Sequence, residues 1–137
     1  GTSTAASTTA TFTLPGNYVI TLTVTDSNGT TKAFTQTIDI EPLVQFFLPN
    51  AFTPNYEGKN EIYKPKGLSF GVGAYTMGIW TRWGEKIFET NNPDEGWNGT
   101  KYNTGQDLPV GVYLCILQYK DARNRPFELR EFVTLVR

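Results

Sequence analysis

Apolar and polar residues alternate in two runs near the start of the chain, which is the pattern of β-strands. Residues 18–25 (YVITLTVT) carry an apolar side chain at every second position, with valine or threonine between. Residues 33–40 (AFTQTIDI) follow after the turn residues Ser27 to Gly29. Period two and many β-branched residues predict two strands, which the turn joins into a β-hairpin. An isolated hairpin is marginal in water, so we expect it to need a neighbouring sheet.

The pattern of apolar residues predicts further strands downstream. Residues 43–52 (LVQFFLPNAF) form a near-continuous apolar run, which predicts a strand buried on both faces. Residues 74–84 (AYTMGIWTRWG) alternate again. The short run 85–90 (EKIFET) is expected to pair with them through a turn at Trp83-Gly84.

Two long strands are predicted at 111–121 and 126–137, with ARNR between them. Residues 91–109 are dense in turn-forming residues, which predicts a loop. No window of about 11 residues has helical periodicity. We therefore predict an all-β chain, with an immunoglobulin-like antiparallel β-sandwich preceded by the hairpin.

The composition changes along the chain. The first 43 residues hold thirteen threonines and four charged residues, whereas the other 94 hold 21 charged and sixteen aromatic residues. We place a boundary near Glu41-Pro42, which separates a first part, 1–43, from a domain at 44–137. The first ten residues (GTSTAASTTA) have the composition of a flexible linker.

The net charge and the residue types that the chain lacks narrow the range of functions to be considered. A net charge of −1 gives no reason to expect nucleic-acid binding, and no apolar run approaches the roughly 18 residues of a spanning helix. The chain has no histidine, the usual general base. Two acidic pairs are candidates for acid–base catalysis, and proximity in sequence is the only evidence for that role. They are Glu57 with Glu61 and Asp94 with Glu95. We expect no catalytic residue and no enzyme. The single cysteine lies in the apolar run VYLCIL, which indicates burial.

The loop 49–63 (PNAFTPNYEGKNEIY) is a candidate calcium site. Calcium binds several oxygens within a short span, and Asn55, Glu57, Asn60 and Glu61 offer some of them. The aspartate ladder of an EF-hand loop is missing. The alternative, which we favour, is a turn that a proline initiates and in which asparagine side chains bond to the backbone. We expect no cofactor or metal, with calcium as the alternative.

Trp80, Trp83 and Trp97 lie within one 18-residue window. Exposed aromatic side chains would suit a carbohydrate-binding module, which is our alternative function. Aromatic residues also fill the cores of small β domains, and we favour this role, for Trp83 in particular. Arg82 is a candidate to stack on a neighbouring ring.

Two resemblances extend this picture. Residues 14–40 (LPGNYVITLTVTDSNGTTKAFTQTIDI) combine a Pro-Gly-x-Tyr strand, a Val-x-Asp turn and a last strand. They resemble the end of a PKD-type immunoglobulin-like repeat. The resemblance implies that 1–43 is a linker with the C-terminal portion of a PKD-like domain.

Six blocks occur in order in the rest of the chain. They are FFLPNAFTPN (46–55), EGKNEIYKPKG (57–67), IWTRWGEKIFET (79–90), GWNGT (96–100), LPVGVYLCILQYKD (108–121) and FVTLVR (132–137). Together they resemble the type B C-terminal domain of type IX secretion cargo in Bacteroidota, also called the gliding motility-associated C-terminal domain. The family's Asn-Gly-Asp-Gly is Asn-Tyr-Glu-Gly here, and its Gly-Trp-Asp is Gly-Trp-Asn. These departures further weaken a metal site.

The second resemblance implies a non-catalytic C-terminal export and sorting signal for an adhesin or other surface protein. It implies recognition by the type IX translocon and by an outer-membrane barrel of the PorP/SprF type, with passenger domains in the same precursor. The expected route crosses the periplasm and outer membrane and ends at the cell surface or outside the cell. We expect no direct membrane insertion.

Two surfaces are candidates for partner binding. The terminal strand Val133–Val136 is expected to offer an unpaired edge, with Arg137 beside the terminal carboxylate. Turn residues are expected to cluster, together with Trp97, if the loops meet at one end of the sandwich. The candidate residues are Pro49, Asn50, Phe52, Pro54, Arg82, Trp83, Gly84, Val133, Thr134, Leu135, Val136 and Arg137.

Overall fold

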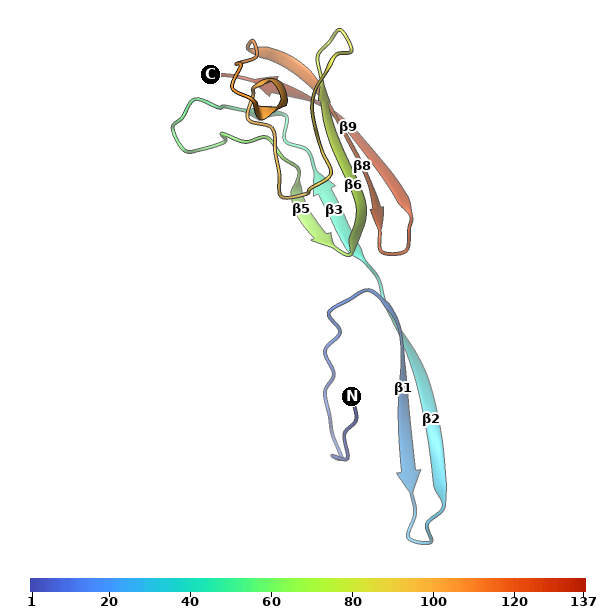
Figure 1. The fold of residues 1–137 in the computed structure, drawn as a ribbon. Helices are drawn as coiled ribbons and strands as arrows, with labels where there is room; N and C mark the ends of the chain where they lie inside the picture. The colour runs from blue at the N-terminus through green and yellow to red at the C-terminus, as the bar shows by residue number, and fades with distance from the viewer. The chain divides into compact units, whose positions relative to one another are not determined.

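The computed structural model describes residues 1–137, except for the side chains of Leu68 and Phe70. Contacts divide the chain into two compact units, Gly1–Pro42 and Leu43–Arg137. Figure 1 shows that both are built from strands. A single 3-10 turn, η1 (Lys101–Asn103), interrupts the loop that precedes the last two strands. The all-β prediction is confirmed, and none of the described segments is a helix long and apolar enough to span a bilayer.

The first unit contains the predicted hairpin. Strands β1 (Gly16–Thr25) and β2 (Thr31–Ile40) pair antiparallel along their whole length. The Asp26 carboxylate closes the turn by accepting hydrogen bonds from the N–H groups of Asn28 and Thr30, at 2.8 and 2.9 Å. The apolar side chains of the hairpin are mostly exposed. Within this unit, backbone hydrogen bonds rather than a core therefore hold the two strands together.

The second unit is a sandwich of unequal sheets. The large sheet has the strand order β4-β9-β8-β6-β7, and the small sheet pairs β3 with β5. All neighbours pair antiparallel except β4 and β9, which are parallel. The strands are β3 (Leu43–Phe47), β4 (Ala51–Phe52), β5 (Lys66–Phe70), β6 (Val72–Trp80), β7 (Lys86–Thr90), β8 (Gly111–Asp121) and β9 (Pro126–Leu135).

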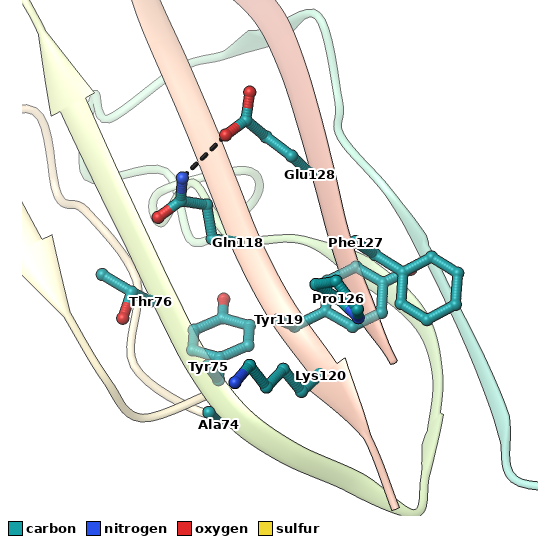
Figure 2. A pocket seen from close by; sticks show the side chains of 9 residues that line it. All are labelled: Ala74, Tyr75, Thr76, Gln118, Tyr119, Lys120, Pro126, Phe127 and Glu128. Carbon is teal, nitrogen blue, oxygen red and sulfur yellow. Dashed lines mark hydrogen bonds between the residues drawn. The ribbon is translucent and has the colours of Figure 1, made fainter. Parts of the chain in front are cut away.

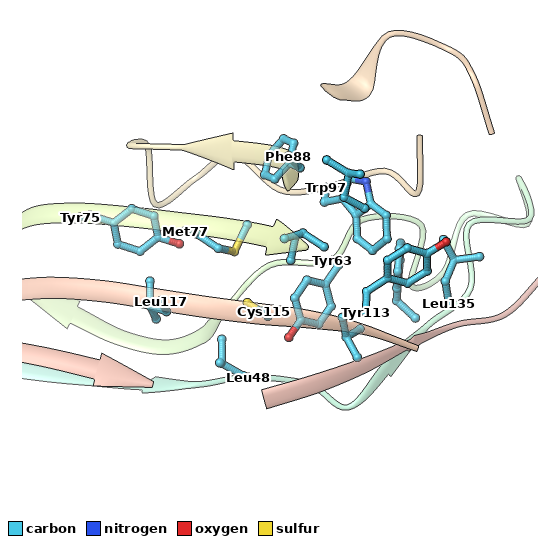
Figure 3. Packing of buried hydrophobic residues seen from close by; sticks show 14 of the residues in the cluster. Leu48, Tyr63, Tyr75, Met77, Phe88, Trp97, Tyr113, Cys115, Leu117 and Leu135 are labelled. Atoms are coloured by element: carbon cyan, nitrogen blue, oxygen red, sulfur yellow. The ribbon is translucent and has the colours of Figure 1, made fainter. Parts of the chain in front are cut away.

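Alternation along the central strands builds the core. Tyr75, Met77 and Ile79 of β6 are buried, as are the alternate residues of β8 from Tyr113 to Tyr119. The ring of Phe46, from the small sheet, packs on Tyr75 and Tyr119 with centroid distances of 5.7 and 4.9 Å. Figure 3 shows how Tyr63 and Trp97, from the two long loops, complete this core.

The run 43–52 is not one strand buried on both faces, so that prediction is wrong. β3 ends at Phe47, and only the two-residue β4 follows after a break. Leu43 and Phe47 are exposed, whereas Val44 and Phe46 pack against the core. Pro49 has no N–H for a ladder, and the chain crosses there from the small sheet to the large one.

The remaining strand predictions are confirmed. β6 and β7 pair across the turn 81–85, with a bulge that leaves Ile87 between two ladder positions. β8 and β9 pair over ten residue pairs. The cysteine of β8, Cys115, is fully buried, as its apolar surroundings predicted.

Candidate functional site

The end of β9 is paired on both sides. Thr134 N–H donates to the carbonyl oxygen of Asn50 at 2.8 Å, and Val136 N–H donates to that of Phe52 at 3.1 Å. Val133 and Leu135 are fully buried. The expectation of an open edge at 133–136 is therefore wrong, because β4 occupies it as a parallel strand.

The last side chain of the chain is fixed to a loop. The guanidinium of Arg137 donates to the carbonyl oxygens of Leu108 and Gly99, and it lies 3.1 Å from a carboxylate oxygen of Asp107. Gly99 permits the close approach of Pro54, since a Cβ at position 99 would lie 2.8 Å from the ring of Pro54. The segment 49–54, the loop 99–108 and Arg137 thus form one packed assembly.

The loop after β4 closes on a single carboxylate. Glu61 accepts hydrogen bonds from the N–H groups of Tyr56 and Gly58, at 2.9 and 3.0 Å. The bond from Tyr56 is the main cause that lowers the pKa of Glu61. Asn55 accepts a longer bond, of 3.3 Å, from Glu57 N–H, as predicted for an asparagine turn. The role of Glu61 in closing this loop could not be predicted from the sequence. A carboxylate that accepts hydrogen bonds from N–H groups several residues away leaves no local sequence pattern.

The described residues contain no group of three or more His, Cys, Asp or Glu side chains arranged to hold a metal ion. Of the four proposed calcium ligands, Glu61 uses both carboxylate oxygens for the loop backbone. A cation at this loop would have to compete with these two hydrogen bonds for the same oxygens.

Trp97 is a core residue, as predicted. It is fully buried, and its indole N–H donates to the carbonyl oxygen of Thr100 at 2.8 Å. Its ring packs on Phe52 and Tyr113, with both centroid distances at 5.1 Å. Its backbone exchanges two 2.8 Å hydrogen bonds with Tyr63. Trp97 therefore joins both long loops to the sheet.

Trp83 is 86% exposed, so its predicted place in the core is wrong. β6 ends at Trp80, and the alternation that would turn a side chain inward ends with it. The turn is well defined, since Thr81 Oγ1 accepts hydrogen bonds from the N–H groups of Trp83 and Glu85. The predicted stacking is confirmed, with Arg82 Cζ 5.7 Å from the Trp83 ring centroid. The carbohydrate-binding alternative predicts several exposed tryptophans, and of the three only Trp83 is mostly exposed.

The predicted turn cluster forms in two parts at one end of the sheet. Pairing of Gly111 with Leu135, and of Leu114 with Trp80, brings the turn 81–85 and the chain end to the same end of the domain (Figure 1). The first part is the assembly around Arg137, in which Phe52 and Pro54 are buried. The second is the exposed turn Arg82–Gly84.

The loop that contains η1 links the two parts. Lys101 forms an ion pair with Glu85, and the Tyr102 hydroxyl donates to the carbonyl oxygen of Lys86 at 2.8 Å. The exposed candidates for partner contact at this end are thus the turn Arg82–Gly84, together with Asn50, Val136 and Arg137.

A hollow of about 400 Å³ lies at the other end of the sheet, beside the β8–β9 turn (Figure 2). Tyr119 and Phe127 stack there with an interplanar angle of 13°. Gln118 Nε2 donates to a Glu128 carboxylate oxygen at 2.7 Å. The Glu128 carboxylate is also paired with Arg130. The hollow is therefore an open aromatic groove whose carboxylate is engaged within the sheet.

A model of the type IX secretion signal domain family matches residues 46–135, and a model of the PKD domain matches residues 1–42. A search of curated proteins found no significant match. Since the first match covers most of the chain and falls on the sandwich described above, the chain belongs to the type IX secretion signal domain family.

Proposed function

We propose that residues 44–137 act as a sorting signal that is read as a folded surface. The signal directs an adhesin or another surface protein through the type IX system and onto the cell surface. It does so by binding outer-membrane components, among them a barrel of the PorP/SprF type. It needs neither catalysis nor a cofactor. The PKD-like segment 1–43 links it to passenger domains of the same precursor.

The observation that supports this proposal is the burial of the final strand. Val133 and Leu135 lie in the core, and β4 and β8 pair with β9 on either side. An extended terminal peptide would have to detach from both neighbours before a receptor could read it. Detaching such a strand costs most of the stability of a small domain. A receptor that reads the folded surface avoids this cost.

The turn Arg82–Gly84 is the proposed anchor for the partner. Tryptophan and arginine dominate the energetics of many protein interfaces, and here both lie on a turn that hydrogen bonds hold in shape. A pre-formed turn loses little entropy on binding. The anchor thus combines a large apolar ring with a cation stacked on it.

The test is export of a reporter protein fused to residues 1–137 in a bacterium that has a type IX system. We expect surface display that depends on the translocon, and a marked loss with Trp83→Ala at an unchanged melting temperature. Tyr56→Ala is the matched control, because Tyr56 is as exposed as Trp83 but lies on another loop. Display in a strain without the translocon would contradict the export role. An equal loss of display with both variants would contradict the proposed role of the turn Arg82–Gly84 as the anchor, but not the export role.

A further inference from the structure

The first part of β8, up to Leu117, is apolar on both of its faces. Residues 110–117 read VGVYLCIL, and the side chains of Tyr113, Cys115 and Leu117 point into the core. The alternate residues Val112, Leu114 and Ile116 are also apolar. A strand with one face in water normally alternates with polar residues, whereas a continuous apolar run is typical of a strand covered on both faces.

The apolar side chains of this outer face form a patch across three strands. The ladder places Trp80 beside Leu114, and Leu114 beside Phe132. With Val112 and Ile116, these residues make up what we call the outer patch. Phe132 is 64% and Val112 50% exposed, and the other three are partly exposed. Contiguous apolar patches on a folded surface mark interaction sites.

Gly78 lets the Trp80 ring lie flat on the sheet. A Cβ at position 78 would lie 2.2 Å from Cη2 and 2.5 Å from Cζ3 of the indole. Any larger residue would therefore lift the ring off the strand. Lys86 Nζ lies 5.8 Å from the centroid of the ring. The outer patch is thus flat as well as apolar.

The charges that border the outer patch are paired within the chain. Lys86 pairs with Glu89 on the β7 side, and Arg130 pairs with Glu128 on the β9 side. A border that is neutral on each side offers little attraction to an anionic membrane or a charged polymer. It suits an uncharged apolar surface with a similar border.

We infer that the outer patch binds the outer patch of a second copy of the chain. A two-fold axis along β8 would lay β6 of one copy over β9 of the other, so that Trp80 meets Phe132 of the second copy. The same axis would bring Arg130 of the second copy over the indole that covers Gly78, beside Glu89. Opposite charges would then face each other, and Arg130 would make a cation–π contact with the indole. A two-fold interface joins the same surface of both copies, so that surface must be complementary to itself. The inference goes beyond the export role and does not rest on it.

The experiment is analytical ultracentrifugation of the 137-residue chain over a wide range of micromolar concentrations. We expect a reversible dimer whose dissociation constant rises about tenfold or more with Phe132→Lys. Val112→Glu, in the same patch, should act alike and serves if the first variant fails to fold. Leu22→Lys is the matched control, because Leu22 is a similarly exposed apolar residue in the first-unit hairpin.

Three outcomes would overturn the inference. The first is a chain that stays monomeric at every concentration. The second is a dimer that Leu22→Lys weakens while the outer-patch variants leave it intact. The third is a monomer that binds phosphatidylethanolamine vesicles through Phe132, which would assign the outer patch to a lipid surface.

Discussion

The guanidinium of Arg137 lies 3.1 Å from the carbonyl oxygen of Gly99, across 38 residues of sequence. This hydrogen bond ties the last residue of the chain to the loop that carries Trp97. Together with the bond to Leu108, it closes the end of the sandwich where the turn Arg82–Gly84 also lies.

Arg137→Gln is expected to lower the free energy of unfolding by about 1–2 kcal/mol, because the two carbonyl groups lose a charged donor. Urea unfolding monitored by tryptophan fluorescence measures this change. Arg130→Gln is the control, since its exposed ion pair with Glu128 should contribute less than about 0.5 kcal/mol. Equal effects of the two variants would mean that Arg137 is an ordinary surface residue.

The tryptophans are expected to differ widely in their effect on stability. Trp97→Ala removes a fully buried ring and should cost about 3–5 kcal/mol. Trp83→Ala removes an exposed ring and should change stability by less than about 0.5 kcal/mol. Thermal unfolding of both variants checks this. A large loss with Trp83→Ala would return that ring to the core, where the sequence pattern placed it.

Most strands could be predicted because hydrophobic patterning is a local signal: β1 and β6 alternate, and the first half of β8 is a continuous apolar run. The outward direction of Trp83 could not be predicted, because the alternation of β6 stops where that strand ends at Trp80. The crossing of β4 to the edge of β9 was also out of reach, since two residues are too few to carry a period. The contacts of Arg137 and Glu61 depend on how distant loops pack, and no spacing in the sequence encodes them.

Acid is expected to weaken the turn between β8 and β9. Burial acts to raise the pKa of Asp121, but hydrogen bonds from the backbone and side chain of Arg125, and from Arg123 N–H, outweigh it and lower this pKa below its ordinary value. A lowered pKa in the folded state means that the carboxylate stabilises the fold above its unfolded pKa, near about 4. That stabilisation is lost as the pH falls through the folded pKa.

Asp121→Asn should therefore be less stable than the wild type at neutral pH, and the gap should narrow below a pH of about 4. Urea midpoints measured across this range test the point. A gap that stays constant down to the lowest pH at which both chains fold would show that the charge of Asp121 contributes nothing.

Cys115 is expected to report on unfolding of the sandwich. The side chain is fully buried, and burial raises the pKa of its thiol to about 12. Because the thiolate is the reactive form, a thiol reagent at neutral pH should label it only when the sheet opens. The labelling rate should rise with urea in parallel with loss of tryptophan fluorescence. Fast labelling under native conditions would contradict the buried position.

The proposed function requires that the signal is read as a folded surface. The most direct test is to measure the export of a variant whose core is disrupted. Leu117→Asp places a charge in the fully buried centre of β8 and leaves residues 126–137 unchanged. The quantity to measure is the surface-to-total ratio of a reporter fused to residues 1–137, for this variant and for the wild type. We predict that the ratio collapses for Leu117→Asp, although the terminal segment is intact. A ratio equal to that of the wild type would show that the terminal peptide alone is the signal.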